Sequence, residues 1–94
     1  MTAEDVTAEI FVSGRVHGVN YRAFTEQEAN LLGLAGYVRN LSDGRVQVEA
    51  EGNRKAIEEL INRLRKGPGR AHVTGVEVSF KPAHGKFTVF TIRY

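Results

Sequence analysis

The 94-residue sequence contains no cysteine, which excludes disulfide bonds and zinc–thiolate sites. A small domain without disulfides is typical of a reducing compartment. The chain also lacks an apolar run near the roughly 20 residues that a membrane span needs. Its first nine residues have no apolar stretch and include Glu4, Asp5 and Glu9, which argues against a signal peptide. These absences predict a cytoplasmic protein with no membrane partner.

A large excess of one charge sign is missing too, because 13 basic and 11 acidic residues leave a net charge of +2. Such a balance does not indicate a nucleic-acid partner. The local distribution is uneven: the segment from Arg15 to Arg22 holds two arginines, one histidine and no acid. That segment suits a small anion. The length fits one domain over residues 1–94, which buries roughly 60–65% of its unfolded surface.

Hydrophobic periodicity predicts five strands and two helices. The strands show apolar residues at every second position, and the helices show apolar stripes. Asp43-Gly44 favours a hairpin turn, Asn53 is typical of a helix N-cap, and the strand near Gly75 is expected to start irregularly. In chain order the expected elements are strand 6–13, helix 21–32, strand 36–41, strand 46–51, helix 54–66, strand 73–80 and strand 87–94.

This β-α-β-β-α-β order with a closing strand is the ferredoxin-like split-βαβ pattern of an α+β fold. It predicts one antiparallel sheet that carries both helices on one face. The last strand, with Phe87, Phe90 and Tyr94, is expected at an exposed edge. Because this fold hosts many functions, the function has to be argued from the site.

The loop from Gly14 to Arg22 leads into a helix N-terminus, where the first N–H groups lack intrahelical partners and favour anions. The nucleotide-binding P-loop signature is absent. Arg22 falls in the first helical turn, where the helix dipole disfavours a cation unless an anion is bound. Its guanidinium can hold two phosphate oxygens. The alternative is an exposed arginine whose stem packs on the sheet.

Asn40 lies where the second strand ends, a position at which asparagine usually serves turn chemistry. Its carboxamide can also accept a hydrogen bond from water and donate one to another oxygen, as the positioning of a nucleophilic water requires. His17 has no histidine or carboxylate near it in sequence, so a metal site is not indicated and its ring is expected to face solvent. Glu26 and Glu28 are expected to be solvated rather than catalytic.

Two contiguous motifs resemble the acylphosphatase family. Residues 12–22 (VSGRVHGVNYR) are similar to its V-x-G-x-V-Q-G-V-x-[FY]-R, and residues 36–46 (GYVRNLSDGRV) to its G-[WYF]-V-R-N-x-x-D-G-x-V. The resemblance spans nearly the whole chain. It implies a ferredoxin-like fold and a metal-independent, cofactor-free hydrolysis of acyl phosphates to a carboxylate and inorganic phosphate.

The resemblance also implies roles for single residues. Arg22 would bind the phosphate, and Asn40 would orient the attacking water. Backbone N–H groups of the loop would cradle the phosphoryl group, from Val16, His17, Gly18, Val19, Asn20 and Tyr21. His17 stands where the family commonly has glutamine, and Asn20 occupies a variable position. If the side chain of His17 contributes, phosphate affinity becomes pH-dependent near neutrality.

Three other interpretations stay open. An RNA-binding module of this fold would show an RNP1-like run and strand aromatics, and the sequence has no such run and few such aromatics. A regulatory relative would bind an anion without turnover, and a purely structural domain would leave the loop unexplained. For the enzyme, we expect a monomer whose partner is a small acyl phosphate. The sequence does not name the physiological substrate.

Overall fold

The structure, a computed structural model, describes residues 5–94. Glu4, one of the acidic residues that argue against a signal peptide, lies outside the described residues. The elements follow the predicted order, and the last strand departs most from its predicted bounds because it begins at Phe90. In chain order they are β1 (Asp5–Arg15), α1 (Tyr21–Leu31), β2 (Ala35–Asn40), β3 (Val46–Asn53), α2 (Arg54–Lys66), β4 (His72–Pro82) and β5 (Phe90–Arg93).

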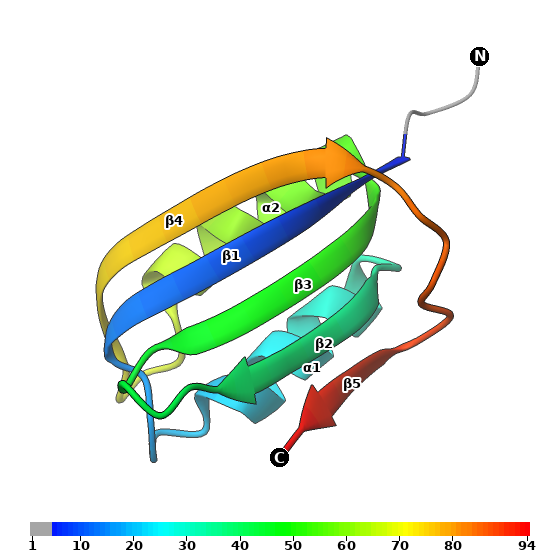
Figure 1. Cartoon of the computed structure of the whole chain (residues 1–94). Coiled ribbons are helices and arrows are strands. Elements are labelled where there is room, and N and C mark those ends of the chain that lie inside the picture. The colour runs from blue at the N-terminus through cyan, green and yellow to red at the C-terminus, as the bar shows by residue number, and fades with distance from the viewer. Residues whose placement is uncertain (1–4) are drawn as a thin grey trace.

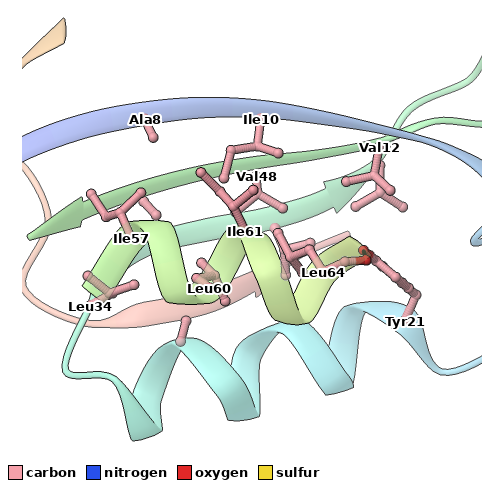
Figure 2. Close-up of a cluster of buried hydrophobic side chains, with 14 of the residues drawn as sticks. Ala8, Ile10, Val12, Tyr21, Leu34, Val48, Ile57, Leu60, Ile61 and Leu64 are labelled. Carbon is pink, nitrogen blue, oxygen red and sulfur yellow. Dashed lines mark hydrogen bonds between the residues drawn. The ribbon is translucent and has the colours of Figure 1, made fainter. Parts of the chain in front are cut away.

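One five-stranded sheet in the order β4-β1-β3-β2-β5 carries both helices on one face, which confirms the predicted layers (Figure 1). Strand residues that face the helices are apolar and buried, as Figure 2 shows for Ala8, Ile10, Val12 and Val48. No helix within residues 5–94 is long and apolar enough to cross a bilayer.

Helix α2 presents the clearer apolar stripe, and its buried residues are Ile57, Leu60, Ile61 and Leu64. Its N-terminus is capped as predicted, because the side chain of Asn53 accepts hydrogen bonds from the N–H groups of Lys55 and Ala56. Helix α1 buries smaller residues, and its one large buried side chain is Tyr21. The Tyr21 hydroxyl donates to the Leu64 carbonyl at 2.7 Å and joins the two helices (Figure 2).

The predicted antiparallel sheet is wrong in one respect: the sheet is mixed, because β5 runs parallel to β2. Strand β4 ends beside Val6, at the end of the sheet where β2 begins. Residues 83–89 then cross that end to the far edge, a distance of about 19 Å at about 4.8 Å per strand, which the seven residues can span. Since β5 starts level with the start of β2, it has to run in the same direction (Figure 1).

Glu51 holds the crossing segment in place. Its Oε2 accepts hydrogen bonds from the backbone N–H groups of His84 at 2.6 Å and Gly85 at 2.8 Å and from the Thr7 hydroxyl at 3.2 Å. Burial alone would raise the pKa of the Glu51 carboxyl, but these donors outweigh burial and hold the pKa below its ordinary value of 4.5.

Two predicted details of the outer strands are confirmed. β5 is an edge strand, although Phe90 turns into the core and only Tyr94, 97% exposed, is fully open to solvent. The pairing of β1 with β4 shifts register between Ser13 and Gly14, opposite Gly75, where an irregularity was expected. Pairing nevertheless continues beyond that shift, so β4 begins earlier than predicted, at His72.

Candidate active site

The N-terminus of α1 lies near the ends of β2 and β5 (Figure 1). Residues of these elements and of the β1–α1 loop line a cavity of about 170 Å³. This volume is below the roughly 300–1,000 Å³ of pockets for drug-sized ligands, so the cavity suits a small group. Its lining combines residues that the sequence analysis selected with three that it missed. The lining residues are Val16, Gly18, Asn20, Tyr21, Arg22, Ala23, Asn40, Ile92 and Tyr94.

The loop between β1 and α1 owes its shape to two buried valines and two left-handed residues. Val16 and Val19 are 1% and 8% exposed and fasten the loop to the core. Gly18 and Asn20 have φ angles of 71° and 66°, a region that glycine enters freely and asparagine tolerates. The two left-handed residues turn the chain into α1, and both of them line the cavity.

The N-terminus of α1 is uncapped. The first helical hydrogen bond runs from the N–H of Phe24 to the carbonyl of Asn20, so the preceding N–H groups of the first turn lack intrahelical acceptors. The side chain of Asn20 makes no capping hydrogen bond, and the first turn contains no acid. The result is a cluster of N–H groups with partial positive charge beside the cavity.

Arg22 belongs to this first turn and is half-buried. Among residues 5–94, no carboxylate forms an ion pair with it. Its guanidinium instead lies over the ring of Tyr94, with Cζ at 4.7 Å from the ring centroid. The charge of Arg22 is therefore available to an anion in the cavity, and the aromatic ring beside it is the exposed ring of Tyr94.

Asn40 is the last residue of β2 and lines the same cavity. Its Oδ1 is shielded from solvent and accepts no hydrogen bond from the described part of the chain. The hairpin turn does not use this side chain, because it is closed by the N–H of Leu41 donating to Arg45 O and by Asp43 accepting from Arg45 N. A shielded acceptor without a donor is costly, and an O–H donor in the cavity would satisfy it.

Two predicted loop residues do not line the cavity. Val19 is buried in the core. His17 is exposed as expected, but its Nε2 lies 2.9 Å from the carbonyl oxygen of Arg45. The prediction for Glu28 needs correction, because its carboxylate is only 18% exposed and pairs with Arg63 at 2.9 Å, so it joins the two helices.

Other ionisable groups near the cavity are not placed for catalysis. The hydroxyl of Tyr21 is bonded to the Leu64 carbonyl, and burial raises the pKa of this hydroxyl, which keeps it protonated. Within residues 5–94, no group of three or more histidine, aspartate or glutamate side chains is placed to hold a metal ion.

Three residues that line the cavity were not predicted from the sequence: Ala23, Ile92 and Tyr94. Ala23 could have been predicted, because it belongs to the first turn of α1, where unpaired N–H groups were expected to face an anion. Ile92 and Tyr94 reach the cavity because β5 lies beside β2 and runs parallel to it. The sequence of residues 87–94 contains no local signal that this strand pairs with β2.

The fold and the cavity together define a ferredoxin-like α+β domain in which an uncapped helix N-terminus, an arginine and an asparagine line one cavity at the end of the sheet. The model of the Acylphosphatase family matches residues 8–92. An acylphosphatase of Methanococcoides burtonii is 48% identical over 93 residues, which cover 98% of this chain and 97% of that protein.

Solved structures agree with the family match. The crystal structure of acylphosphatase from Bacillus subtilis has a TM-score of 0.92 at 35% identity, covering 95% of this chain and 99% of that one. An acylphosphatase from Coxiella burnetii has a TM-score of 0.91 at 33% identity, covering 96% and 94%. The chain belongs to the acylphosphatase family, which confirms the predicted fold and the prediction of an enzyme.

Proposed function

We propose that the chain hydrolyses the carboxyl-phosphate anhydride of acyl phosphates, with Arg22 binding the phosphoryl group and Asn40 holding the attacking water. Family membership supports the reaction. The observation that carries the residue roles is the shielded, unpartnered Oδ1 of Asn40, which shares one cavity with Arg22 and the uncapped N-terminus of α1.

The phosphoryl oxygens would be held from two directions. Backbone N–H groups of the loop and of the first turn of α1 donate from one side, where the helix dipole also favours negative charge. Arg22 donates two parallel N–H groups from the other. As the bond to the leaving carboxylate breaks, charge shifts within the phosphoryl group, and fixed donors of this kind stabilise it.

The water would be held by Asn40. An O–H of the water donates to Oδ1, which leaves an oxygen lone pair free to point at phosphorus. Holding the water opposite the leaving group gives the in-line geometry that phosphoryl transfer needs. The P–O bond to the acyl group breaks as the new P–O bond forms, and the proton of the water passes to a phosphoryl oxygen.

The leaving group explains why so few functional groups suffice. A carboxylate is stable at neutral pH, so its departure needs no strong general acid. The substrate itself accepts the proton of the water, so no protein base is needed. We therefore propose that turnover requires neither a metal ion nor a cofactor. A cytoplasmic location, a monomeric state and the absence of a nucleic-acid partner stay predictions.

The test is the hydrolysis of benzoyl phosphate by purified protein in EDTA, followed as release of benzoate. Arg22→Ala and Asn40→Ala are compared with Arg65→Ala and Asn62→Ala, which remove the same residue types from the exposed face of α2. The inhibition constant of inorganic phosphate is measured for each variant, and circular dichroism checks that each is folded.

We expect Arg22→Ala to lose about 10²–10³-fold in kcat, as for the removal of one donor to a transition-state oxyanion. Asn40→Ala should lose about 100-fold, as for the misplacement of a reacting group. Arg22→Ala should also weaken phosphate inhibition, whereas Asn40→Ala should leave it nearly unchanged, because Asn40 contacts the water. The α2 variants should match wild type. Turnover that stops in EDTA and returns with Mg²⁺ would overturn metal independence, and an active Asn40→Ala would overturn the role of Asn40.

A further inference from the structure

The side chain of His17 connects two segments beside the cavity that are far apart in sequence. Its Nε2 lies 2.9 Å from the carbonyl oxygen of Arg45, 28 residues away. The same carbonyl accepts the N–H of Leu41 at 2.8 Å, and Leu41 directly follows Asn40. One carbonyl oxygen thus joins the β1–α1 loop to the end of the strand that carries Asn40.

The chemistry of this contact fixes the role of the imidazole nitrogen. A backbone carbonyl oxygen only accepts, so Nε2 has to carry the proton. An Nε2–H group donates to this carbonyl, whereas the Nδ1–H tautomer would leave Nε2 as an acceptor that faces another acceptor. A nitrogen held as a donor is not a general base, so His17 does not activate the water through Nε2.

The buried side chains of the loop hold it to the core but not to the hairpin after Asn40. Val16 and Val19 fasten it to the core, whereas Gly18 and Asn20 are exposed. Within residues 5–94, the contact with Arg45 is therefore the one side-chain hydrogen bond that ties the loop to the hairpin. A single exposed hydrogen bond adds little to overall stability. The hydrogen bond between His17 and Arg45 instead holds the loop in position relative to Asn40.

We propose that His17 is a positioning residue: it holds the phosphate-binding loop at a fixed distance from Asn40, so that bound phosphoryl group and held water meet in line. The proposal rests on the proposed function. A displacement of about 1 Å in such an arrangement lowers a rate by about 100-fold. His17 should therefore affect kcat, whereas phosphate binding, which needs the loop and Arg22 but not Asn40, should change little.

The experiment compares wild type with His17→Ala, His17→Phe and His17→Gln. Phenylalanine keeps a ring but has no donor, and glutamine keeps an N–H donor. His72→Ala, which removes an exposed histidine of β4, is the matched control. The readouts are kcat with benzoyl phosphate and the inhibition constant of inorganic phosphate. The ¹⁵N spectrum of the wild-type imidazole reports which ring nitrogen carries the proton.

We expect His17→Ala and His17→Phe to lose about tenfold or more in kcat with less than a threefold change in the phosphate inhibition constant. His17→Gln should recover most of the rate, His72→Ala should match wild type, and Nε2 should be protonated. Unchanged kcat in the Ala and Phe variants, an equal loss of phosphate affinity, or no recovery in His17→Gln would overturn the proposal. If His17→Ala fails to fold, the Phe and Gln pair decides.

A failure of the proposed function looks different. Wild type would then release no benzoate, and the positioning role of His17 would be refuted together with the proposed reaction. An active wild type with unaffected variants would remove His17 alone and leave the roles of Arg22 and Asn40 standing.

Discussion

The hydrogen bond between the two helices provides a sharp test of the packing. Tyr21 is 1% exposed, and its hydroxyl donates to the Leu64 carbonyl at 2.7 Å. Within a helix, the Leu64 carbonyl would accept a hydrogen bond from the backbone N–H of residue 68. Residue 68 is proline, which has no N–H, so the carbonyl has no intrahelical donor. Tyr21→Phe removes the hydroxyl and leaves a buried carbonyl unpaired. We expect a loss of about 1–3 kcal/mol in the free energy of unfolding.

The same substitution has a pH dependence whose sign can be worked out. Burial raises the pKa of the Tyr21 hydroxyl above its ordinary value of 10.0. A raised pKa means that this group stabilises the fold fully below pH 10 and progressively less above it, because the unfolded chain ionises first. Each pH unit above 10 costs the wild type about 1.4 kcal/mol through this residue. Phenylalanine does not ionise, so the variant escapes that loss.

The assay is guanidinium unfolding of wild type and Tyr21→Phe at pH 7 and pH 11, with Tyr94→Phe as the control. Tyr94 is 97% exposed, so loss of its hydroxyl should change stability by less than about 0.5 kcal/mol. The difference between wild type and Tyr21→Phe should narrow by about 1.4 kcal/mol from pH 7 to pH 11. A difference below 0.5 kcal/mol at pH 7 (about the spread of neutral substitutions), or one that does not narrow, would refute the reasoning.

Three further predictions concern the sheet and the cavity. Glu51→Gln should cost about 2 kcal/mol at pH 7, and because the pKa of Glu51 is lowered, this difference should shrink in unfolding curves taken below about pH 4. Gly36→Ala should cost about 3 kcal/mol or more, because its φ is 138° and a Cβ would overlap Glu49 O, whereas Gly33→Ala, strained but in open space, should cost about 1–2 kcal/mol. Tyr94→Leu should raise the phosphate inhibition constant about two- to fivefold through loss of the ring beneath the guanidinium, and Tyr94→Phe should not.

The parts of the site that sequence analysis anticipated are those encoded in contiguous segments. Residues 12–22 contain a strand end, a turn and a helix start, so Arg22 can be placed at a helix N-terminus from local patterns alone. Asn40 is found in the same way, at the end of a strand before Asp43-Gly44. That both residues line one cavity follows from the fold order, and the structure brings them together. Their catalytic roles stay predictions.

The missed parts depend on contacts between segments that carry no local signal for each other. The direction of β5, and with it the approach of Ile92 and Tyr94, depends on the path of residues 83–89 across the sheet end. That path is fixed by a carboxylate on β3 that accepts backbone N–H groups of the segment. The contact of His17 with Arg45 is likewise between two loops, and a histidine in a loop has no partner that spacing can reveal.

The two helices begin with the same residue type in two backbone conformations, and the difference separates a capped helix start from an open one. Asn53 has φ −61° and ψ 132° and caps α2 with its side chain. Asn20 has φ 66° and ψ 24°, and its side chain makes no capping bond. Asparagine is a favourable N-cap residue, so the backbone, and not the residue type, keeps the start of α1 open.

Leaving α1 uncapped forgoes about 1 kcal/mol of stability, which a bound anion should restore. Inorganic phosphate at ten times its dissociation constant should add about 1.4 kcal/mol to the free energy of unfolding, since only the folded chain has the site. For a domain of this length, that gain raises the midpoint of thermal unfolding by roughly 6–11 °C. Chloride at matched ionic strength is the control. If Arg22→Ala gains as much from phosphate as wild type does, the anion binds elsewhere and the start of α1 is not the site.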